Sequence, residues 1–275
     1  MNDLMSTPTT APFLITKEVR RFTEFCDACR RYRYIGLCYG PSGVGKSLSA
    51  RHCARWDLVE PRVAPHPFAP ETPTPPELAD CRSILYTPSV TTTPKRLGEQ
   101  IDQLARALSW AVEEVLHPDE PNPYARHRAD WTELILVDEA DRLKLSALEE
   151  IRDHYDRGGI GLVLIGMPGI EKRLARYAQF YSRVGFVHEF RPLAGEELRF
   201  VLACQWQQLG LMYDPEDAED AAAMALAMQI TRGNFRLIER LFAQIDRILR
   251  INKLRQVTTE VVVAAREGLV IGPPA

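Results

Sequence analysis

The hydrophobic positions of this chain alternate between short continuous runs and longer stretches with helical spacing. Short apolar runs flanked by glycine, proline or charged residues predict buried strands at 34–39, 83–87, 133–137, 160–165 and 187–190. Apolar residues that recur every three or four positions predict helices at 16–33, 46–56, 94–116, 145–157 and 168–177. Strands that alternate with helices in this way predict a parallel, doubly wound α/β sheet.

The pattern changes after Pro192. Four helical patterns follow without a convincing strand, at 195–209, 215–229, 233–251 and 258–267. We therefore predict an α/β core over residues 16–192 and a small C-terminal helical lid over residues 193–268. The remaining ends are expected to be a flexible N-terminus, residues 1–15, and a short tail, residues 269–275.

Residues 61–76 hold seven prolines. Proline disrupts a helix interior and removes a hydrogen-bond donor from a central strand. We expect neither element there, and interpret the segment as an exposed, extended insertion in the core.

Composition narrows the possible classes of function. The 275 residues are 45% hydrophobic and 26% charged, with a net charge of −3, which favours a globular core and argues against a strongly basic nucleic-acid binder. Any DNA contact must therefore come from a local patch. No apolar run approaches the ~18 to 20 residues of a membrane-spanning helix, and the first residues lack the features of a signal peptide. A cytoplasmic location without a membrane segment is expected.

Six scattered cysteines fit a reducing compartment. Cys26 and Cys29 form a lone C-x-x-C pair, whereas a zinc site needs about four ligands. Cys38, His52 and Cys53 keep the zinc alternative open, but we favour two thiols on the buried face of an amphipathic helix.

Residues 40–47 satisfy the phosphate-loop pattern G-x-x-x-x-G-K-S between a predicted strand and a predicted helix. Glycines let the backbone curl until its N–H groups point at phosphate oxygens, and the next helix presents its positive end. Lys46 is expected to reach the β- and γ-phosphates of ATP, and Ser47 to ligate Mg²⁺. The predicted nucleotide-binding residues are Gly40, Pro41, Ser42, Gly43, Val44, Gly45, Lys46, Ser47 and Asp138.

Two acids follow the predicted strand Leu134–Val137. The carboxyl ends of parallel strands are where doubly wound sheets bind ligands. We expect Asp138 to hold Mg²⁺ with Ser47, and Glu139 to polarise the attacking water.

The segments GPSGVGKS, LVDEADRL, LVLIGMPG, FYSRVGF and TRGNFRLIERL occur here in the order found in AAA+ ATPases. More narrowly, the chain resembles the transposon-encoded ATPases of the MuB, TnsC and TniB group, which help choose insertion sites. The resemblance covers roughly residues 16–265. It implies a P-loop NTPase of the AAA+ type that forms a homo-oligomer, either a ring or a helical filament.

The resemblance also assigns two arginines. Arg183 matches the arginine finger, which would reach the γ-phosphate on a neighbouring subunit; Arg191, Arg176 and Arg173 are the alternatives. Arg236 matches the lid arginine called sensor 2, which would touch the phosphates of its own subunit.

The sequence departs from the family pattern after the fourth strand. AAA+ proteins usually place Asn, Ser or Thr there to position the lytic water, and this chain has Met167. We therefore expect slow hydrolysis, or another side chain in that role.

In the resembling transposon ATPases the loop and helix after the second strand face DNA. The corresponding residues here are Thr91, Thr92, Thr93, Lys95 and Arg96. Hydroxyls and cations suit phosphate contacts without base readout, repeated on every subunit. The alternative is an ordinary polar loop that caps a helix.

The combined hypothesis is an ATP-dependent, DNA-binding regulator of transposition. It would oligomerise on double-stranded DNA, recruit or activate a transposase or targeting factor, and disassemble on hydrolysis. The alternatives are a regulatory or secretion-associated AAA+ ATPase without a DNA role, a replication-type loader or initiator, and a nucleotide-stabilised scaffold that barely hydrolyses.

Overall fold

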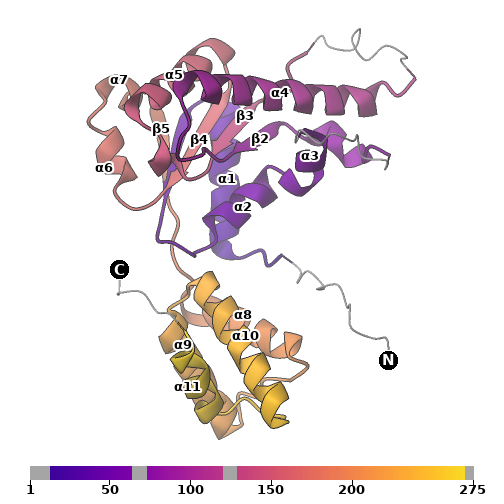
Figure 1. Ribbon diagram of the computed structural model, residues 1–275, viewed down its shortest axis with the longest axis vertical. Coiled ribbons are helices and arrows are strands. Elements are labelled where there is room, and N and C mark those ends of the chain that lie inside the picture. Colours follow the sequence, from indigo (N-terminus) through magenta and orange to yellow (C-terminus); the bar gives the residue numbers. More distant parts are fainter. Residues whose placement is uncertain (1–12, 64–72, 120–128, 270–275) are drawn as a thin grey trace.

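The computed structural model describes residues 13–63, 73–119 and 129–269. Within these residues, the larger of two lobes contains a five-stranded sheet in the order β2-β3-β4-β1-β5, flanked by helices (Figure 1). The strands are β1 Ile35–Tyr39, β2 Ser83–Tyr86, β3 Leu134–Val137, β4 Gly161–Gly166 and β5 Val184–Glu189. Every neighbouring pair is parallel, which confirms the predicted α/β fold class.

The strand order brings the ends of β1, β3 and β4 together. β4 lies between β1 and β3, with Tyr39 opposite Gly166 and Val137 opposite Leu164. Because the strands are parallel, the loops that follow them emerge at one edge of the sheet. The phosphate loop, the acidic pair and Met167 therefore share that edge.

Helix α1, Lys17–Tyr32, packs against the sheet. It begins at Thr16, whose hydroxyl accepts a hydrogen bond of 3.2 Å from the Val19 N–H, as a helix N-cap should. Cys26 and Cys29 lie on its buried face, and burial raises the pKa of Cys29 to about 12. The described residues contain no group of three or more His, Cys, Asp or Glu side chains placed to hold a metal ion.

The other helices of the larger lobe connect the strands. They are α2 Lys46–Cys53, α3 Trp56–Val63, α4 Pro94–Leu116, α5 Leu145–Gly158, α6 Ile170–Leu174 and α7 Ala178–Tyr181, with 3₁₀ turns at Pro76–Asp80 and Ala140–Arg142. None of the helices in the described part of the chain combines the length and apolar character needed to cross a membrane.

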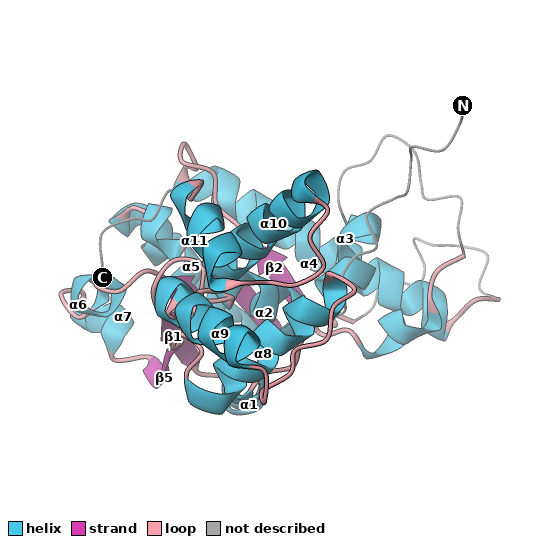
Figure 2. Ribbon diagram, turned by 90° about the horizontal axis from the view of Figure 1, so that it is seen from below, coloured by secondary structure: helices cyan, strands magenta, loops and turns pink. Residues whose placement is uncertain are grey.

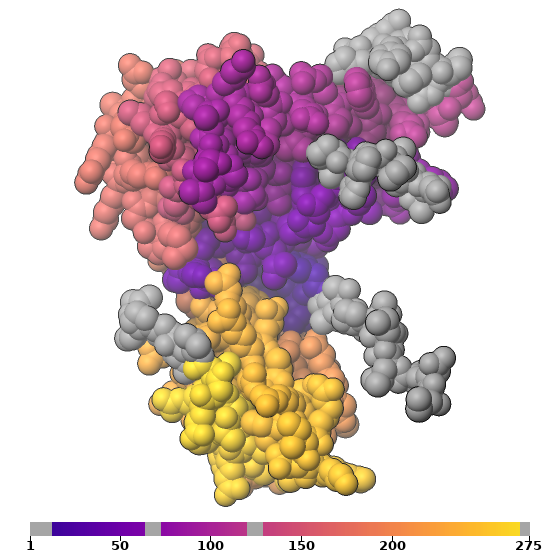
Figure 3. Space-filling view, viewed as in Figure 1, coloured from indigo at the N-terminus to yellow at the C-terminus, as the bar shows by residue number. Residues whose placement is uncertain are grey.

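The smaller lobe consists of four helices in the described part of the chain. It lies below the sheet in Figure 1, and Figure 3 shows the same residues, in orange and yellow, below the larger lobe. The helices are α8 Gly195–Gln208, α9 Ala218–Thr231, α10 Phe235–Asn252 and α11 Thr259–Glu267. Their buried faces form a hydrophobic cluster of their own, which includes Trp206 and Leu241. The view from below shows α10 and α11 beside each other in this lobe (Figure 2).

Several element boundaries differ from the sequence prediction. The helix predicted at 46–56 stops at Cys53, because Arg55 adopts a left-handed conformation with φ of +49°. The predicted helix 168–177 is replaced by the shorter α6 and α7, and β5 begins at Val184 rather than at residue 187.

The prediction that residues 61–76 contain no helix was wrong at its start, since α3 includes Pro61. This proline costs one backbone hydrogen bond near the end of a two-turn helix. Burial of Trp56, Val59 and Val63 on the other side of α3 offsets that loss. Residues 64–72 of the predicted insertion, residues 1–12 of the N-terminus and residues 270–275 of the tail lie outside the described residues.

Candidate functional site

The phosphate loop joins β1 to α2 and needs glycine for two different reasons. A Cβ on Gly40 would lie 2.2 Å from the Phe190 carbonyl oxygen, so no side chain fits there. Gly43 has a φ of +79°, a conformation that residues with a Cβ rarely adopt. The backbone can therefore curl as a phosphate cradle requires.

Lys46 lies at the amino end of α2, and its Nζ donates to the carbonyl oxygens of Gly40 at 2.6 Å and Pro41 at 2.7 Å. Burial lowers the pKa of Lys46, and the nearby acidic side chains, including Asp138, act in the opposite direction. A partly buried cation beside a helix amino end is suited to bind a phosphate.

The acidic pair stands across the cavity from Lys46, at the end of β3. Asp138 is buried, and its carboxylate accepts the N–H of Glu139 at 2.9 Å. Glu139 has a φ of +52°, so its backbone is left-handed. The Glu139 carboxylate is ion-paired with Arg142, one turn further along the chain.

The position of Met167 is supported by a residue that the sequence reasoning did not single out. The Met167 N–H donates to Oδ2 of Asp141 at 2.7 Å, and the Met167 side chain lines the cavity. Arg173 holds the Asp141 segment in place by donating to the carbonyl oxygens of Ala140 and Asp141. Asp141 is therefore the fixed polar side chain beside Met167, and its only sequence signal was its place in the LVDEADRL segment.

The smaller lobe, which is the predicted lid, reaches the phosphate loop through the amino end of α10. Arg236 Nη1 donates to the Ser42 hydroxyl at 2.8 Å, and its backbone N–H donates to the Gly43 carbonyl at 3.2 Å. Asn234, the N-cap of α10, donates through Nδ2 to the Ser42 carbonyl at 2.7 Å. Arg236 thus contacts the loop itself, while its predicted contact with the phosphates stays a prediction. Asn234 is a second contact to the loop, which the sequence analysis did not predict.

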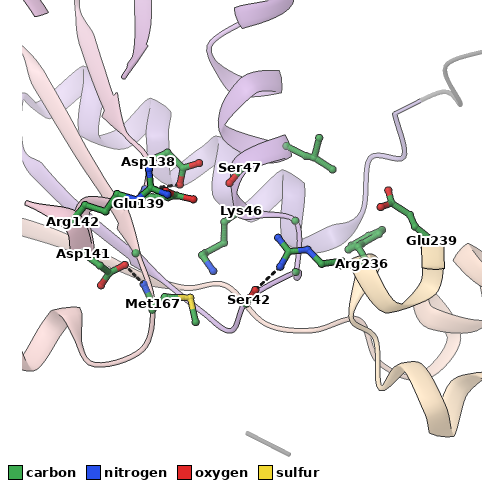
Figure 4. Close-up of a pocket in the computed structure, with 15 residues that line it drawn as sticks. Ser42, Lys46, Ser47, Asp138, Glu139, Asp141, Arg142, Met167, Arg236 and Glu239 are labelled. Atoms are coloured by element: carbon green, nitrogen blue, oxygen red, sulfur yellow. Dashed lines mark hydrogen bonds and ion pairs between the residues drawn. The ribbon is translucent and has the colours of Figure 1, made fainter. Parts of the chain in front are cut away.

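These groups surround a cavity of about 450 Å³, and ligand pockets span about 300–1,000 Å³. Figure 4 shows Lys46 between the acidic residues on one side and Arg236 with Glu239 on the other. Ser47 and Asp138 offer the hard oxygen ligands that Mg²⁺ prefers, and the glycine backbone with Lys46 suits a triphosphate. The residues present therefore fit ATP and Mg²⁺.

Arg183 lies at the opposite edge of the sheet. Its carbonyl accepts the N–H of Ile35, the first residue of β1, so it is separated from the phosphate loop by the length of that strand. Five residues at about 3.3 Å each span about 16 Å. Its guanidinium forms two hydrogen bonds to Asp156, of 2.6 and 2.8 Å, and these bonds raise the pKa of Arg183. Arg183 cannot reach the nucleotide of its own chain, so its predicted role remains one between subunits.

The alternatives for the finger are placed differently. Arg173 is committed to the Ala140–Asp141 carbonyls of its own chain, as described above. Arg191 lies two residues beyond β5 and pairs with Glu189, the last residue of that strand. Arg176 follows α6 and is exposed.

The predicted DNA-contacting residues lie in the loop after β2 and in the first turn of α4. The Thr93 hydroxyl caps α4 by accepting the Arg96 N–H at 3.3 Å. Thr93 therefore has the helix-capping role that the alternative interpretation, an ordinary polar loop, gives to this segment. Thr91, Lys95 and Arg96 are exposed, and Lys95 makes a 3.9 Å ion pair with Glu99. This loop leaves the sheet at the same edge as the phosphate loop.

A parallel sheet with a glycine-rich phosphate loop, an adjacent acidic strand end and a lid arginine on that loop defines a P-loop nucleoside triphosphatase of the AAA type. The comparisons with known proteins agree. The AAA domain family matches residues 29–174, more than half of the chain, and the chain belongs to this family.

Two similar sequences extend over most of the chain. A protein of Staphylococcus aureus described as a potential ATP-binding protein is 43% identical over 94% of this chain and 97% of its own length. The Mu-like prophage FluMu DNA transposition protein B of Haemophilus influenzae is 23% identical over 84% of this chain and 71% of its own length.

Solved structures share the fold. The Thermotoga maritima RuvB Holliday junction branch migration motor matches with a TM-score of 0.55 and 17% identity, over 92% of this chain and 69% of that one. The Aeropyrum pernix ORC1 protein, solved in complex with DNA, matches with a TM-score of 0.58 and 21% identity, over 94% and 67%. At these identities, the two similarities bear on the fold alone.

Proposed function

We propose that this protein is an ATP-dependent regulator of DNA transposition. It assembles on double-stranded DNA as a homo-oligomer, a ring or a helical filament, and recruits or activates a transposase or a target-selection protein. ATP hydrolysis then dismantles the assembly. Similarity to the FluMu DNA transposition protein B supports the role in transposition. Similarity to the potential ATP-binding protein of Staphylococcus aureus supports the use of ATP.

The observation that carries the assembly step is the separation between the cavity and Arg183. The phosphate loop lies at the carboxyl edge of the sheet and Arg183 at the amino edge. If Arg183 stabilises charge on a γ-phosphate, that phosphate belongs to another copy of the chain. A site completed by a second subunit couples ATP binding to assembly.

Five side chains of the cavity and the loop backbone have proposed roles in hydrolysis. The loop N–H groups and Lys46 hold the β- and γ-phosphates, while Ser47 and Asp138 hold Mg²⁺. When bound, Mg²⁺ neutralises charge on the transferred phosphoryl group. Glu139 accepts a proton from the attacking water, and Arg236 links the lid to the phosphates.

The loop after β2 supplies the proposed DNA contact through Thr91, Thr92, Thr93, Lys95 and Arg96. Its hydroxyls and cations suit backbone phosphates, and an oligomer repeats them along the duplex. The net charge of −3 favours the second candidate, a regulatory AAA+ ATPase that assembles without DNA.

Electron microscopy with a slowly hydrolysed ATP analogue, with and without double-stranded DNA, separates these candidates. Rings or filaments that require both ligands support the proposal, and oligomers indifferent to DNA support the second candidate. Glu139→Gln with ATP is the matched variant, because it keeps the side-chain shape and removes the base. We expect its DNA-bound assemblies to persist after wild-type assemblies have dispersed.

A further inference from the structure

The far end of the smaller lobe carries a second cavity, separate from the nucleotide site. It has a volume of about 650 Å³ and lies where the loop between α8 and α9, residues 209–217, meets the loop between α10 and α11, residues 253–258. Helix α10 begins at the phosphate loop and runs for 18 residues, about 27 Å, before it reaches the second of these loops (Figure 1). The cavity is therefore remote from the ATP site.

The lining of this cavity carries uncompensated negative charge. One basic side chain, Arg255, lines it together with four acidic ones, Asp214, Asp217, Asp220 and Glu260. In the described part of the smaller lobe the one ion pair joins Arg250 and Asp246, so no cation of this lobe neutralises the four carboxylates. Such a surface attracts a cationic ligand and repels nucleic acid.

Hydrogen bonds fix the two loops before any ligand arrives. Gln256 Nε2 donates to Oδ1 of Asp217 at 3.2 Å and to Oδ1 of Asp220 at 3.4 Å, which ties one loop to the other. The Glu219 carboxylate accepts the backbone N–H and the hydroxyl of Thr259, at 2.7 and 2.8 Å, and so ties α9 to α11. A preformed site loses little freedom when it binds.

Apolar side chains complete the lining. Val257 and Val261 are buried, whereas Met212 and Leu254 stay exposed, at 87% and 45%. Scattered exposed apolar side chains are common, but these two adjoin a concave surface that is itself partly apolar. They can cover an apolar side chain of a ligand, and the flexible methionine can adapt to its shape.

Trp206 distinguishes between classes of cationic ligand. It lines the cavity and is 1% exposed, yet its indole Nε1 has no hydrogen-bond acceptor within the described residues. Edge-to-face contacts with Tyr213 and Phe242 hold the ring, with centroid distances of 5.9 and 5.1 Å. Buried N–H groups are nearly always paired, so this one favours a ligand that brings an acceptor. A polyamine brings none, whereas each residue of a peptide brings a carbonyl oxygen.

We propose that this cavity is a docking site for a peptide segment of a partner protein, one that combines lysine or arginine with an apolar side chain. The cations pair with the exposed carboxylates, the apolar side chain packs against Met212 and Leu254, and a backbone carbonyl oxygen accepts the Trp206 N–H. Identifying this partner with the protein recruited in transposition rests on the proposed function. The binding step itself needs neither ATP nor DNA.

The test begins with a phage-displayed library of random peptides, selected on the full-length protein without nucleotide or DNA. We expect the enriched sequences to carry lysine or arginine beside leucine, methionine or an aromatic residue. Synthetic peptides of these sequences are then titrated by fluorescence anisotropy, and their affinity should fall with added salt because salt screens exposed charges. A library that yields no enriched sequence, or only sequences without cations, overturns the proposal.

Two variants and a matched control locate the binding. Glu260→Gln should weaken binding of the selected peptide by up to about fivefold, the factor for one exposed ion pair. Met212→Ser should weaken it about tenfold, through the lost apolar burial. Glu196→Gln is the control, since Glu196 is also an exposed acid in the first turn of a helix of this lobe but lies outside the cavity lining. Unchanged affinity in both test variants excludes this cavity as the site.

The indole N–H of Trp206 reports on the acceptor directly. In ¹⁵N-labelled protein Trp206→Phe identifies its signal among those of the four tryptophans. Peptide binding should move that proton signal downfield, as a new hydrogen bond does. The Trp131 signal should stay in place, because that N–H already donates to Glu113 at 2.8 Å. A Trp206 signal that does not move at saturating peptide contradicts the proposed contact.

Failure of the docking site and failure of the proposed function give different results. If the protein assembles on DNA but no peptide is enriched, the docking site is wrong and the proposed function stands. If cationic peptides bind at this cavity and the protein does not assemble on DNA, the docking site stands and its partner is not a transposition protein.

Discussion

Replacing Gly43 with alanine tests whether the lid is latched to the phosphate loop at this one residue. A Cβ on Gly43 would lie 2.4 Å from Oδ1 of Asn234. That oxygen caps α10 by accepting the Leu237 N–H at 3.2 Å, and the Nδ2 of the same side chain donates to the Ser42 carbonyl. The new methyl group therefore strains the loop and displaces the lid contact together.

The size of the effect follows from these contacts. A left-handed backbone costs a residue with a Cβ about 1–2 kcal/mol. Loss of the α10 cap costs about 1 kcal/mol, and loss of the hydrogen bond to Ser42 costs about 1 kcal/mol more. We expect Gly43→Ala to lower the free energy of unfolding by about 3–4 kcal/mol, the sum of these contributions.

Two control variants separate the contributions in urea unfolding. Gly159 also has a left-handed φ, +54°, but nothing lies within 4 Å of its Cβ position, so Gly159→Ala measures backbone strain alone. Asn234→Ala removes the cap and the Ser42 contact without straining the loop. Gly43→Ala should cost about as much as both controls together.

Nucleotide binding supplies the second measurement. Displaced loop N–H groups should weaken binding of an ATP analogue by about tenfold or more in Gly43→Ala, which is 1.4 kcal/mol. Gly159→Ala should bind as the wild-type protein does. If Gly43→Ala is no less stable than Gly159→Ala and binds nucleotide normally, the inference that the lid is held to the phosphate loop at Gly43 is wrong.

Four further outcomes are expected. Lys46→Ala should abolish ATP binding in a titration, and unchanged affinity would remove the phosphate-loop assignment. Arg183→Ala should bind ATP normally but fail to assemble or turn over; normal oligomers by light scattering would exclude it as the finger. Charge reversal at Lys95 and Arg96 should weaken binding to all DNA sequences alike, so a sequence-selective loss would contradict backbone contact. Burial lowers the pKa of His188 from 6.5 to about 4, so the unfolded chain binds more protons between these values and stability falls as the pH drops through them. His188→Phe should flatten that part of the pH–stability curve in calorimetry, and an unchanged slope would assign the acid sensitivity elsewhere.

Local patterns determined much of the architecture. The short apolar runs at Leu134–Val137 and Gly161–Gly166 are buried strands, and α4 spans residues 94–116 as predicted from Pro94 and the apolar spacing after it. The parallel arrangement follows from the alternation of strands and helices, because each helix returns the chain to the same end of the sheet. That arrangement places the phosphate loop beside Asp138.

Tertiary packing overrode local signals in α3. The helix continues through Pro61 because one side of it is buried against the core, which the proline count alone did not reveal. The early start of β5 has a similar origin, since pairing with β1 begins at Val184 opposite Ile35. A partner strand can extend a strand beyond its own apolar run.

The sequence by itself determined which residues have the chemistry for ATP, since loop curvature, charge and strand ends are local properties. Only the tertiary structure decided which distant residues contact the segments around the site. Arg142 meets Pro88 across 54 residues, and Asn234 meets Ser42 across 192. Hydrophobic periodicity specifies which face of an element is buried, but not which distant loop lies against it. Those contacts depend on how the strands are ordered and where the lid packs.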